Sequence, residues 1–154
     1  MHPETRPPRP DVTQELDRFT RTCRERGVPV THQRLSVLRA LLESHEHPDA
    51  EGVFRRLRPG FPALSLGTVY KTLDLLTALG FAHPVGAAGP RRRYDANAHA
   101  HHHLRCSSCH RLDDIAHASL EDVRLPAGHG FQVTGYTILF DGICADCRAT
   151  AHAK

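Results

Sequence analysis

The chain has 154 residues, of which 40% are hydrophobic and 24% are charged, and its formal net charge is +3. This composition is typical of a globular protein with one domain or two small ones, and it excludes a disordered chain. No apolar run approaches the roughly 20 residues that a membrane-spanning helix requires, and the N-terminus has no apolar signal-peptide core. We therefore expect a cytoplasmic protein without membrane contacts.

The first ten residues contain four prolines and few apolar groups, so residues 1–10 are expected to form a flexible arm. Apolar residues then recur at three- and four-residue steps in four segments, which is the spacing of one face of an α-helix. Thr31, Asp49 and Ser65 can each cap a helix, and Gly27, Pro59 and Gly80 favour helix ends. The expected helices are 12–26, 31–44, 49–58 and 65–79.

Two short β-like stretches follow the fourth segment, Phe81–Val85 and Arg91–Asp95, joined by a Gly-Ala-Ala-Gly-Pro turn. Short helices followed by a small hairpin are typical of a winged helix-turn-helix. We expect residues 11–95 to form a winged-helix DNA-binding domain. A winged helix that binds another protein is the alternative, because a fold does not determine a function.

In a helix-turn-helix the second helix of the pair enters the major groove, and here that helix begins at Ser65. Its outward side combines phosphate-binding groups with groups that contact a thymine methyl, namely Ser65, Thr68, Tyr70, Lys71 and Thr72. Arg91, Arg92 and Arg93 lie on the expected wing, where they are placed to bind phosphates or the minor groove. The alternative is that Tyr70 belongs to the core and the arginines form a solvated turn.

The second half differs in composition, since four of the five cysteines and most of the histidines lie beyond residue 80. Residues 96–100 are the expected linker, and residues 101–154 are expected to form a small α/β domain. The predicted elements are strands at His101–Arg105, Leu112–Ile115 and Phe131–Phe140 and a helix at Ser119–Leu125. The fold class is therefore α+β.

Two C-x-x-C pairs, Cys106 with Cys109 and Cys144 with Cys147, offer four thiolates that complete the tetrahedron of a closed structural zinc site. The 34 residues between the pairs exceed the spacing of a compact zinc ribbon, so a small sheet must bring the pairs together. In a reducing compartment paired cysteines favour metal binding. A redox dithiol and surface thiols are the alternatives. Cys23 stands alone and is expected in the core.

Histidines crowd the segment that follows Asp95. On a strand, His99, His101 and His103 point to one face and His102 to the other. Two imidazoles from one strand are a common start for a site that binds divalent iron, manganese or zinc. A solvated histidine-rich linker is one alternative. A metal hydrolase is another, but the chain has no clear general base and no H-E-x-x-H helix, so no enzyme is expected.

The order and spacing of these motifs resemble the ferric uptake regulator family from about Asp11 to Cys147. The matching motifs are Thr31-His-Gln-Arg34, His47-Pro48, Ser65-Leu-Gly-Thr-Val-Tyr70, Arg93-Tyr94-Asp95, His101-His102-His103 and both C-x-x-C pairs. The resemblance implies a transcription repressor that is a homodimer through its C-terminal dimerisation domains. It also implies binding to double-stranded DNA with an A/T-rich inverted repeat, and we expect Gln33 and Arg34 to contact that DNA.

The resemblance further implies a regulatory metal site at the junction of the two domains. The positions that match its ligands are His47, Asp95, His101, His103 and Asp114. Because these ligands come from both domains, full metal binding requires one relative orientation, and the metal shifts the population toward the DNA-binding form. A third site in some members would use His102 and Glu121, but Tyr136 stands where a histidine is expected, so no third ion is expected.

Iron sensors of the family commonly carry glutamate at the positions of Asp95 and Asp114, whereas the peroxide-responsive branch resembles this chain in having aspartate at both. Zinc sensors tend to use a cysteine near the linker, where this chain has none. In the peroxide-responsive branch, bound ferrous iron reacts with hydrogen peroxide and oxidises the nearest histidines, here His47 and His101. We expect a peroxide-sensing repressor with a regulatory Fe²⁺ or Mn²⁺. The alternative is a manganese- or iron-uptake regulator without peroxide chemistry.

Overall fold

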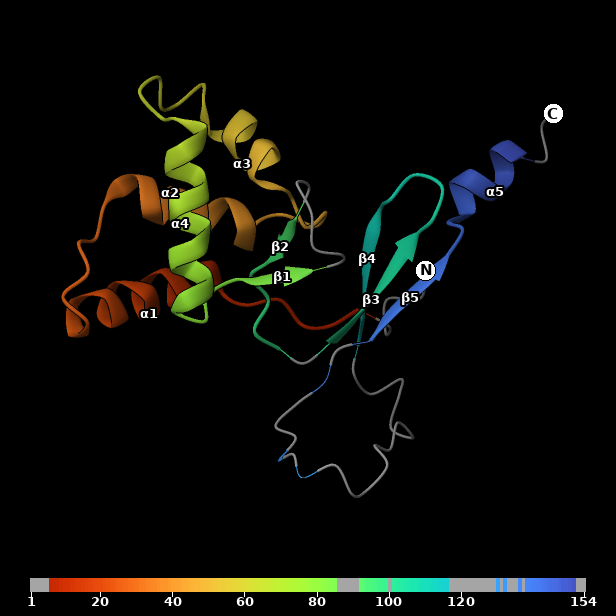
Figure 1. Cartoon of the computed structure of the whole chain (residues 1–154), viewed down its shortest axis with the longest axis horizontal. Helices are drawn as coiled ribbons and strands as arrows, with labels where there is room; N and C mark the ends of the chain where they lie inside the picture. Colours follow the sequence, from red (N-terminus) through yellow and green to blue (C-terminus); the bar gives the residue numbers. More distant parts are fainter. Residues whose placement is uncertain are drawn as a thin grey trace. The chain divides into compact units, whose positions relative to one another are not determined.

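The computed structural model describes residues 6–85, 92–99, 101–116, 130, 132, 136 and 138–151. The chain divides between Ala98 and His99 into two compact units (Figure 1). We term Arg9–Ala98 the helical unit and the part from His99 onward the sheet unit, with which residues 6–8 are grouped. In the described part of the chain, no helix is long and apolar enough to cross a membrane.

Helices α1 to α4 of the helical unit confirm the four predicted helices, with ends that differ by a few residues. They are α1 (Val12–Glu25), α2 (His32–Leu42), α3 (Ala50–Leu57) and α4 (Leu66–Ala78). Each helix is preceded by an N-cap residue whose side-chain oxygen accepts a hydrogen bond from the backbone N–H three residues later. These N-cap residues are Asp11, Thr31, Asp49 and Ser65. Gly27 and Gly80 follow α1 and α4 with φ angles of 64° and 76°, a left-handed conformation that glycine adopts without a steric penalty.

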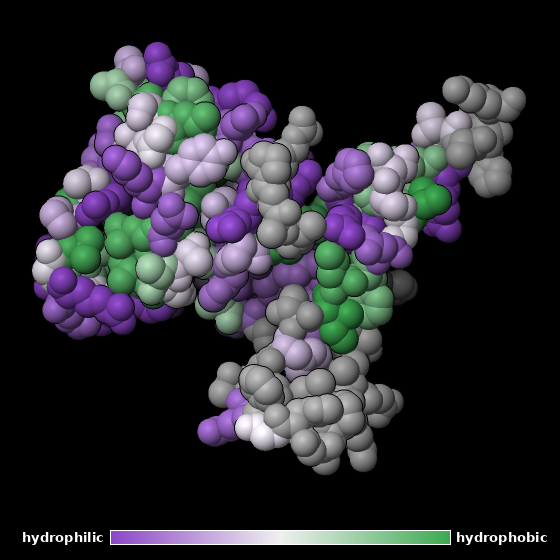
Figure 2. Space-filling model, in the orientation of Figure 1, coloured by the Kyte–Doolittle hydropathy of each residue, from purple (hydrophilic) through white to green (hydrophobic). Residues whose placement is uncertain are grey.

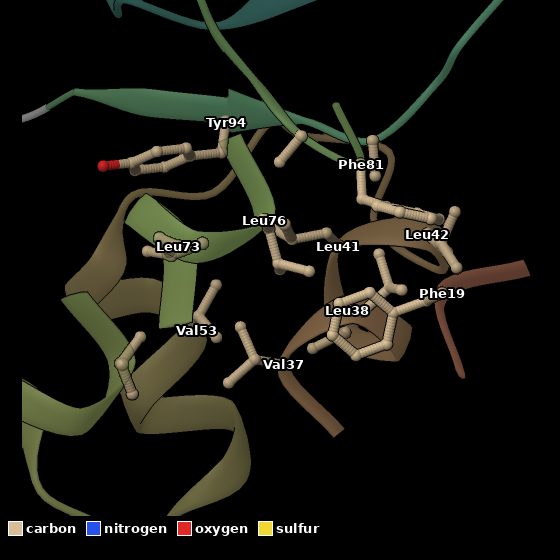
Figure 3. Close-up of a cluster of buried hydrophobic side chains, with 14 of the residues drawn as sticks. Phe19, Val37, Leu38, Leu41, Leu42, Val53, Leu73, Leu76, Phe81 and Tyr94 are labelled. Atoms are coloured by element: carbon tan, nitrogen blue, oxygen red, sulfur yellow. The ribbon is translucent and has the colours of Figure 1, made fainter. Parts of the chain in front are cut away.

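Helix α2 is the centre of the helical unit, since it contacts α1, α3 and α4. Figure 3 shows side chains from these helices converging on one cluster, which includes Phe19, Leu38, Val53 and Leu73. All four are buried, and burial of such a side chain stabilises a fold by roughly 1.5–3 kcal/mol. This core orients α4 so that Val69, Leu73 and Leu76 face inward and the other side of the helix faces solvent.

A two-stranded antiparallel hairpin follows α4, formed by β1 (His83–Val85) and β2 (Arg93–Asp95). The predicted first strand began at Phe81, and this start was wrong. The backbone N–H groups of Phe81 and Ala82 both donate to the Leu76 carbonyl, and both residues are buried against the helices. They therefore close the end of α4, and the strand begins only beyond them. Four helices and a hairpin make the helical unit a winged helix-turn-helix.

The sheet unit contains β3 (His101–Cys106), β4 (Leu112–Ala116), β5 (Leu139–Gly142) and α5 (Ala145–Ala151). Strand β3 is central, antiparallel to β4 and parallel to β5. The last described strand ends at Gly142, opposite Cys106 and two residues beyond the predicted end at Phe140, and most of the predicted residues 131–138 lie outside the described residues. Helix α5 was not predicted. The predicted helix at residues 119–125 lies outside the described residues.

Hydrophilic residues predominate on the visible face of the helical unit (Figure 2). The large apolar side chains that remain exposed, among the described residues, are Tyr70, Leu104, Phe140 and Ile143. Tyr70 lies on α4, and the other three belong to the sheet unit. Leu104 and Ile143 also line an open pocket of about 390 Å³ in that unit. Exposed apolar side chains gathered on one small domain are typical of a surface that binds a partner.

Candidate metal centres and DNA-binding surface

The four paired cysteines lie together in the sheet unit. Their sulfur atoms are all within 4.8 Å of one another, and Cys109 Sγ is 3.8 Å from Cys144 Sγ. Four thiolates around one zinc ion, with bonds of about 2.3 Å, lie about 3.8 Å from each other. The cluster therefore fits a tetrahedral structural zinc site, as the two C-x-x-C pairs predicted.

The backbone holds the first cysteine pair as a tight turn after β3. Cys106 N–H donates to the Arg111 carbonyl at 2.9 Å, His110 N–H donates to the Cys106 carbonyl at 2.9 Å, and His110 has a φ of 60°. The Ser107 N–H donates to the Gly142 carbonyl at 2.8 Å, which joins this turn to the end of β5. The second pair follows directly, so strand pairing brings cysteines 35 residues apart to one point.

Electrostatics of the cluster favour a metal-binding thiolate. Backbone N–H groups of Cys109 and Cys144 point at Cys106 Sγ and lower the pKa of that thiol to about 6. A hydrogen bond from Ser108 acts to lower the pKa of Cys147, but the neighbouring thiols of Cys144, Cys109 and Cys106 outweigh it and raise that pKa to about 12. Four thiolates crowded at one point thus repel each other without a cation, and a divalent ion removes that repulsion.

The second donor set of the sheet unit consists of His101, His103 and Asp114. His101 and His103 alternate along β3, and the register places Asp114 of β4 directly opposite His103. His101 Nε2 lies 3.1 Å from His103 Nε2, and Asp114 Oδ1 lies 3.7 Å and 3.8 Å from these two nitrogens. These separations leave room for an ion at about 2.1 Å from each atom, an ordinary metal–nitrogen or metal–oxygen bond length.

A backbone hydrogen bond sets the tautomer of His101. Its Nδ1 lies 2.7 Å from the His99 carbonyl oxygen, which can only accept. Nδ1 therefore carries the proton, and in the neutral ring Nε2 has the lone pair that a metal ligand needs. Both histidines are buried, with exposed fractions of 8% and 4%, so their placement is that of ordered ligands and the solvated-linker alternative is not supported.

The helical unit contributes a smaller donor set, His47 and Asp95. His47 Nε2 lies 3.8 Å from Asp95 Oδ2, a separation that one bound ion spans. His47 precedes the cap of α3, and Asp95 ends β2. Asp95 Oδ1 accepts a hydrogen bond from the Asn97 N–H at 2.8 Å, which orients the carboxylate.

His102 faces away from His101 and His103 and is fully buried. Its ring stacks on Tyr136, with the ring centroids 5.4 Å apart and the planes inclined by 21°. The Ile138 N–H donates to His102 Nδ1 at 3.3 Å. An aromatic ring thus lies where the third metal site of the family would need a histidine ligand; Glu121 lies outside the described residues.

Several of the predicted DNA contacts come together on the helical unit. Gln33 and Arg34, at the start of α2, line one open pocket of about 200 Å³ with Thr68 and Lys71 of α4. Ser65 and Lys71 are exposed, and Tyr70 is 38% exposed, so Tyr70 is not part of the core. Helix α4 and the start of α2 therefore present one polar surface.

Thr72 was placed on this outward surface, and that was wrong. Its side chain is buried, and its Oγ1 donates to the Thr68 carbonyl at 2.8 Å. A helical threonine satisfies its hydroxyl in this way when it packs inward.

The wing arginines have separate environments. Arg91 lies outside the described residues. Arg92 is exposed, and its guanidinium opposes the rise in the pKa of Tyr94 that burial causes. Arg93 Nη1 donates to the Glu46 carbonyl at 3.1 Å at an exposed position, so part of its guanidinium is bound to the loop before α3. Sequence reasoning missed this contact, since nothing local links residues 47 positions apart.

Sequence reasoning also missed Arg111. Its Nε donates to Asp113 at 3.1 Å and its Nη1 to Asp146 at 2.9 Å, which ties β4 to α5 beside the cysteine cluster. These exposed ion pairs are individually weak, and they link Arg111 to the helix that carries Cys147.

The helical unit thus has a fold that many DNA-binding proteins share, and the two units together carry three sets of candidate metal-binding side chains. The ferric uptake regulator family model matches residues 25–140. The peroxide-responsive repressor PerR of Staphylococcus aureus is 31% identical over 139 residues, which cover 89% of this chain and 94% of that protein. The chain belongs to the ferric uptake regulator family, a family of metal-responsive regulators.

Solved structures of the family share the fold. The Helicobacter pylori ferric uptake regulator, with three functional metal binding sites, superposes with a TM-score of 0.74 at 20% identity and covers 90% of this chain and 95% of its own. A zinc uptake regulator complexed with zinc and DNA has a TM-score of 0.64 at 26% identity and covers 94% of this chain and 99% of its own.

Proposed function

We propose that the chain is a transcriptional repressor that binds DNA when a regulatory metal ion is present. The observation that carries this proposal is the triangle of His101 Nε2, His103 Nε2 and Asp114 Oδ1, whose three separations suit one bound divalent ion. Mixed imidazole and carboxylate donors suit iron, manganese and zinc. The similarity to the zinc uptake regulator complexed with DNA supports the DNA-binding part.

The full ligand set that we propose adds His47 and Asp95 of the helical unit to His101, His103 and Asp114 of the sheet unit. A metal ion whose ligands come from both units can bind all of them in only one relative orientation of the units. The ion then shifts the population toward that orientation by the difference in its affinity for the two states. Such coupling between two sites is typically about 1–3 kcal/mol, which corresponds to about 5–150-fold in affinity.

The DNA contacts that we propose are Gln33, Arg34, Ser65, Thr68, Tyr70, Lys71, Arg91 and Arg92. Helix α4 would enter the major groove, and the start of α2 would bind the adjacent phosphates. A homodimer through the sheet units would present two such helices to an inverted repeat, which we expect to be A/T-rich. The exposed Leu104, Phe140 and Ile143 of the sheet unit support a partner on that unit.

The metals that we propose are zinc in the Cys106, Cys109, Cys144 and Cys147 cluster and Fe²⁺ or Mn²⁺ in the regulatory set. Oxygen ligands such as Asp95 and Asp114 suit either regulatory ion. We further propose that the ferrous form senses hydrogen peroxide by oxidation of His47 or His101, for which similarity to PerR is the support. A manganese- or iron-uptake regulator without peroxide chemistry is the second candidate, favoured by the same oxygen ligands.

A DNA-binding titration tests the proposed function. Duplexes are first selected from a randomised library with manganese-loaded protein, and their affinity is then measured by fluorescence anisotropy at one fixed salt concentration. We expect manganese to tighten binding by at least about 10-fold, within the usual range of such coupling, while a scrambled duplex shows no such gain. Equal affinity with and without manganese would refute metal-dependent DNA binding.

A further inference from the structure

Residues 46–49, the loop that contains His47, are tied to strand β2 by one backbone bridge, to which the hydrogen bond between Tyr94 and Pro48 belongs, and by one side-chain hydrogen bond. Asp49 forms an isolated antiparallel bridge with Arg93. The Tyr94 N–H donates to the Pro48 carbonyl at 3.1 Å, and Arg93 Nη1 donates to the Glu46 carbonyl at 3.1 Å. The loop and the strand therefore form one joint inside the helical unit.

The loop needs such a joint because of the backbone of His47. Its φ of 48° lies in the left-handed region, which a residue with a Cβ atom rarely adopts. Surrounding contacts have to hold a residue in that conformation. The carbonyls of Glu46 and Pro48, on either side of His47, are the two that accept bonds from β2.

Side chains alternate along strand β2, and this alternation agrees with the contacts of Arg93 and Asp95. Arg93 and Asp95 share one face of the strand, while Tyr94 between them is buried in the core. The Arg93 guanidinium bonds to the loop at Glu46, and Asp95 Oδ2 lies 3.8 Å from His47 Nε2. The same face of β2 thus carries the candidate ligand Asp95 and the side chain of Arg93, which bonds to the loop that contains the candidate ligand His47.

We propose that Arg93 is a positioning residue for the regulatory metal, a role that rests on the proposed function of His47 and Asp95 as ligands. By holding residues 46–49 against β2, Arg93 keeps the two ligands of the helical unit in place before an ion arrives. The same joint connects the ligand pair to the α3 cap, Asp49, and to the wing strand. Metal binding there acts on both elements that flank the DNA-reading helix.

The test compares Arg93→Met, which removes the guanidinium, with Arg93→Lys, which keeps a donor. Manganese affinity of the full chain is measured by calorimetry. We expect Arg93→Met to raise the Kd for manganese by about 10-fold or more, the usual effect of losing a residue that orients a metal ligand, and Arg93→Lys to restore part of the affinity. Two measurements show whether the variants fold: their zinc content and their thermal unfolding midpoint without manganese.

A second readout does not involve metal. Amide hydrogen exchange of the peptide that contains Tyr94 is expected to be faster in metal-free Arg93→Met than in the unaltered chain, because the Tyr94 N–H bonds to the loop. Arg58→Met is the matched control, since Arg58 Nη1 also donates to a backbone carbonyl, that of Leu64 at 3.0 Å, within the same unit. This control should leave both manganese affinity and Tyr94 exchange unchanged.

The outcomes separate this proposal from the proposed function. Unchanged manganese affinity in folded Arg93→Met, or an equal loss in Arg58→Met, would overturn the positioning role while leaving metal-dependent DNA binding intact. If the unaltered chain bound DNA equally with and without manganese, the proposed function would fail. The manganese Kd and the exchange rate of the Arg93 variants would then still decide whether the joint holds a metal ligand.

Discussion

Replacing Cys144 with serine is expected to release the structural zinc and unfold the sheet unit. Among the described residues from His99 onward, the buried apolar side chains are only Cys106 and Leu112, so apolar burial in this part is small. Binding of structural zinc is worth on the order of 10–16 kcal/mol in zinc-finger peptides. Zinc content by elemental analysis should fall from about one ion per chain to nearly none, and the sheet unit should lose its protection from hydrogen exchange.

Cys23→Ala is the control for this substitution. Cys23 is buried between the helices, where burial raises the pKa of its thiol, and it lies outside the cysteine cluster. This variant should lose some stability of the helical unit and keep its zinc. Full zinc content and an unchanged unfolding midpoint in Cys144→Ser would contradict the zinc assignment.

Replacing Asp114 with alanine is expected to abolish metal-dependent DNA binding without loss of the structural zinc. The substitution removes the only oxygen donor of the triangle with His101 and His103. Loss of a residue that merely orients a metal ligand costs about 10–100-fold in affinity, so loss of a ligand should weaken manganese binding by at least about 100-fold. Calorimetry measures this affinity, and anisotropy measures the resulting DNA binding.

The neighbouring residue supplies a matched control. Asp113 lies on the same strand, faces the other way and pairs with Arg111 at 3.1 Å. Asp113→Ala should therefore bind manganese and DNA like the unaltered chain. Equal behaviour of the two variants, with both folded and zinc-loaded, would show that Asp114 is not a metal ligand.

One strand carries side chains of both candidate metal centres of the sheet unit. β3 carries His101 and His103 and ends at Cys106. The Ser107 N–H donates to the Gly142 carbonyl and joins this end of β3 to β5 beside the cysteine cluster, so a zinc ion bound there would also help to order the histidines upstream. We therefore expect zinc loss to weaken manganese binding, whereas loss of manganese should leave the zinc in place.

Local signals predicted the helical unit well. Helix starts follow from capping side chains such as Thr31 and Ser65, and the apolar spacing identifies the buried faces. The start of β1 was misplaced because Phe81 and Ala82 are as apolar as strand residues, and only the packed structure shows that they close α4. Short apolar runs do not distinguish these two roles.

Some residues of the candidate sites could likewise be predicted from local sequence signals, and others could not. The spacing of the cysteines predicts the cysteine cluster, and the alternation of side chains along a strand predicts the pair of His101 and His103. Both signals are local in the sequence. Asp114 was found only through the resemblance, since its place opposite His103 depends on strand register. The contact between Arg93 and Glu46 depends on tertiary structure alone, so no pattern in the sequence predicts it.

Peptide mass spectrometry of ferrous-loaded protein after brief exposure to hydrogen peroxide tests whether His47 or His101 senses peroxide, with manganese-loaded protein as the control. In the expected reaction one peroxide oxygen replaces the hydrogen of an imidazole carbon as a hydroxyl group and the other leaves as water. We expect one added oxygen on the peptide of His47 or His101 in the iron sample only, together with loss of DNA binding. Unmodified histidines in protein that still binds iron and DNA would contradict peroxide sensing and favour an uptake regulator.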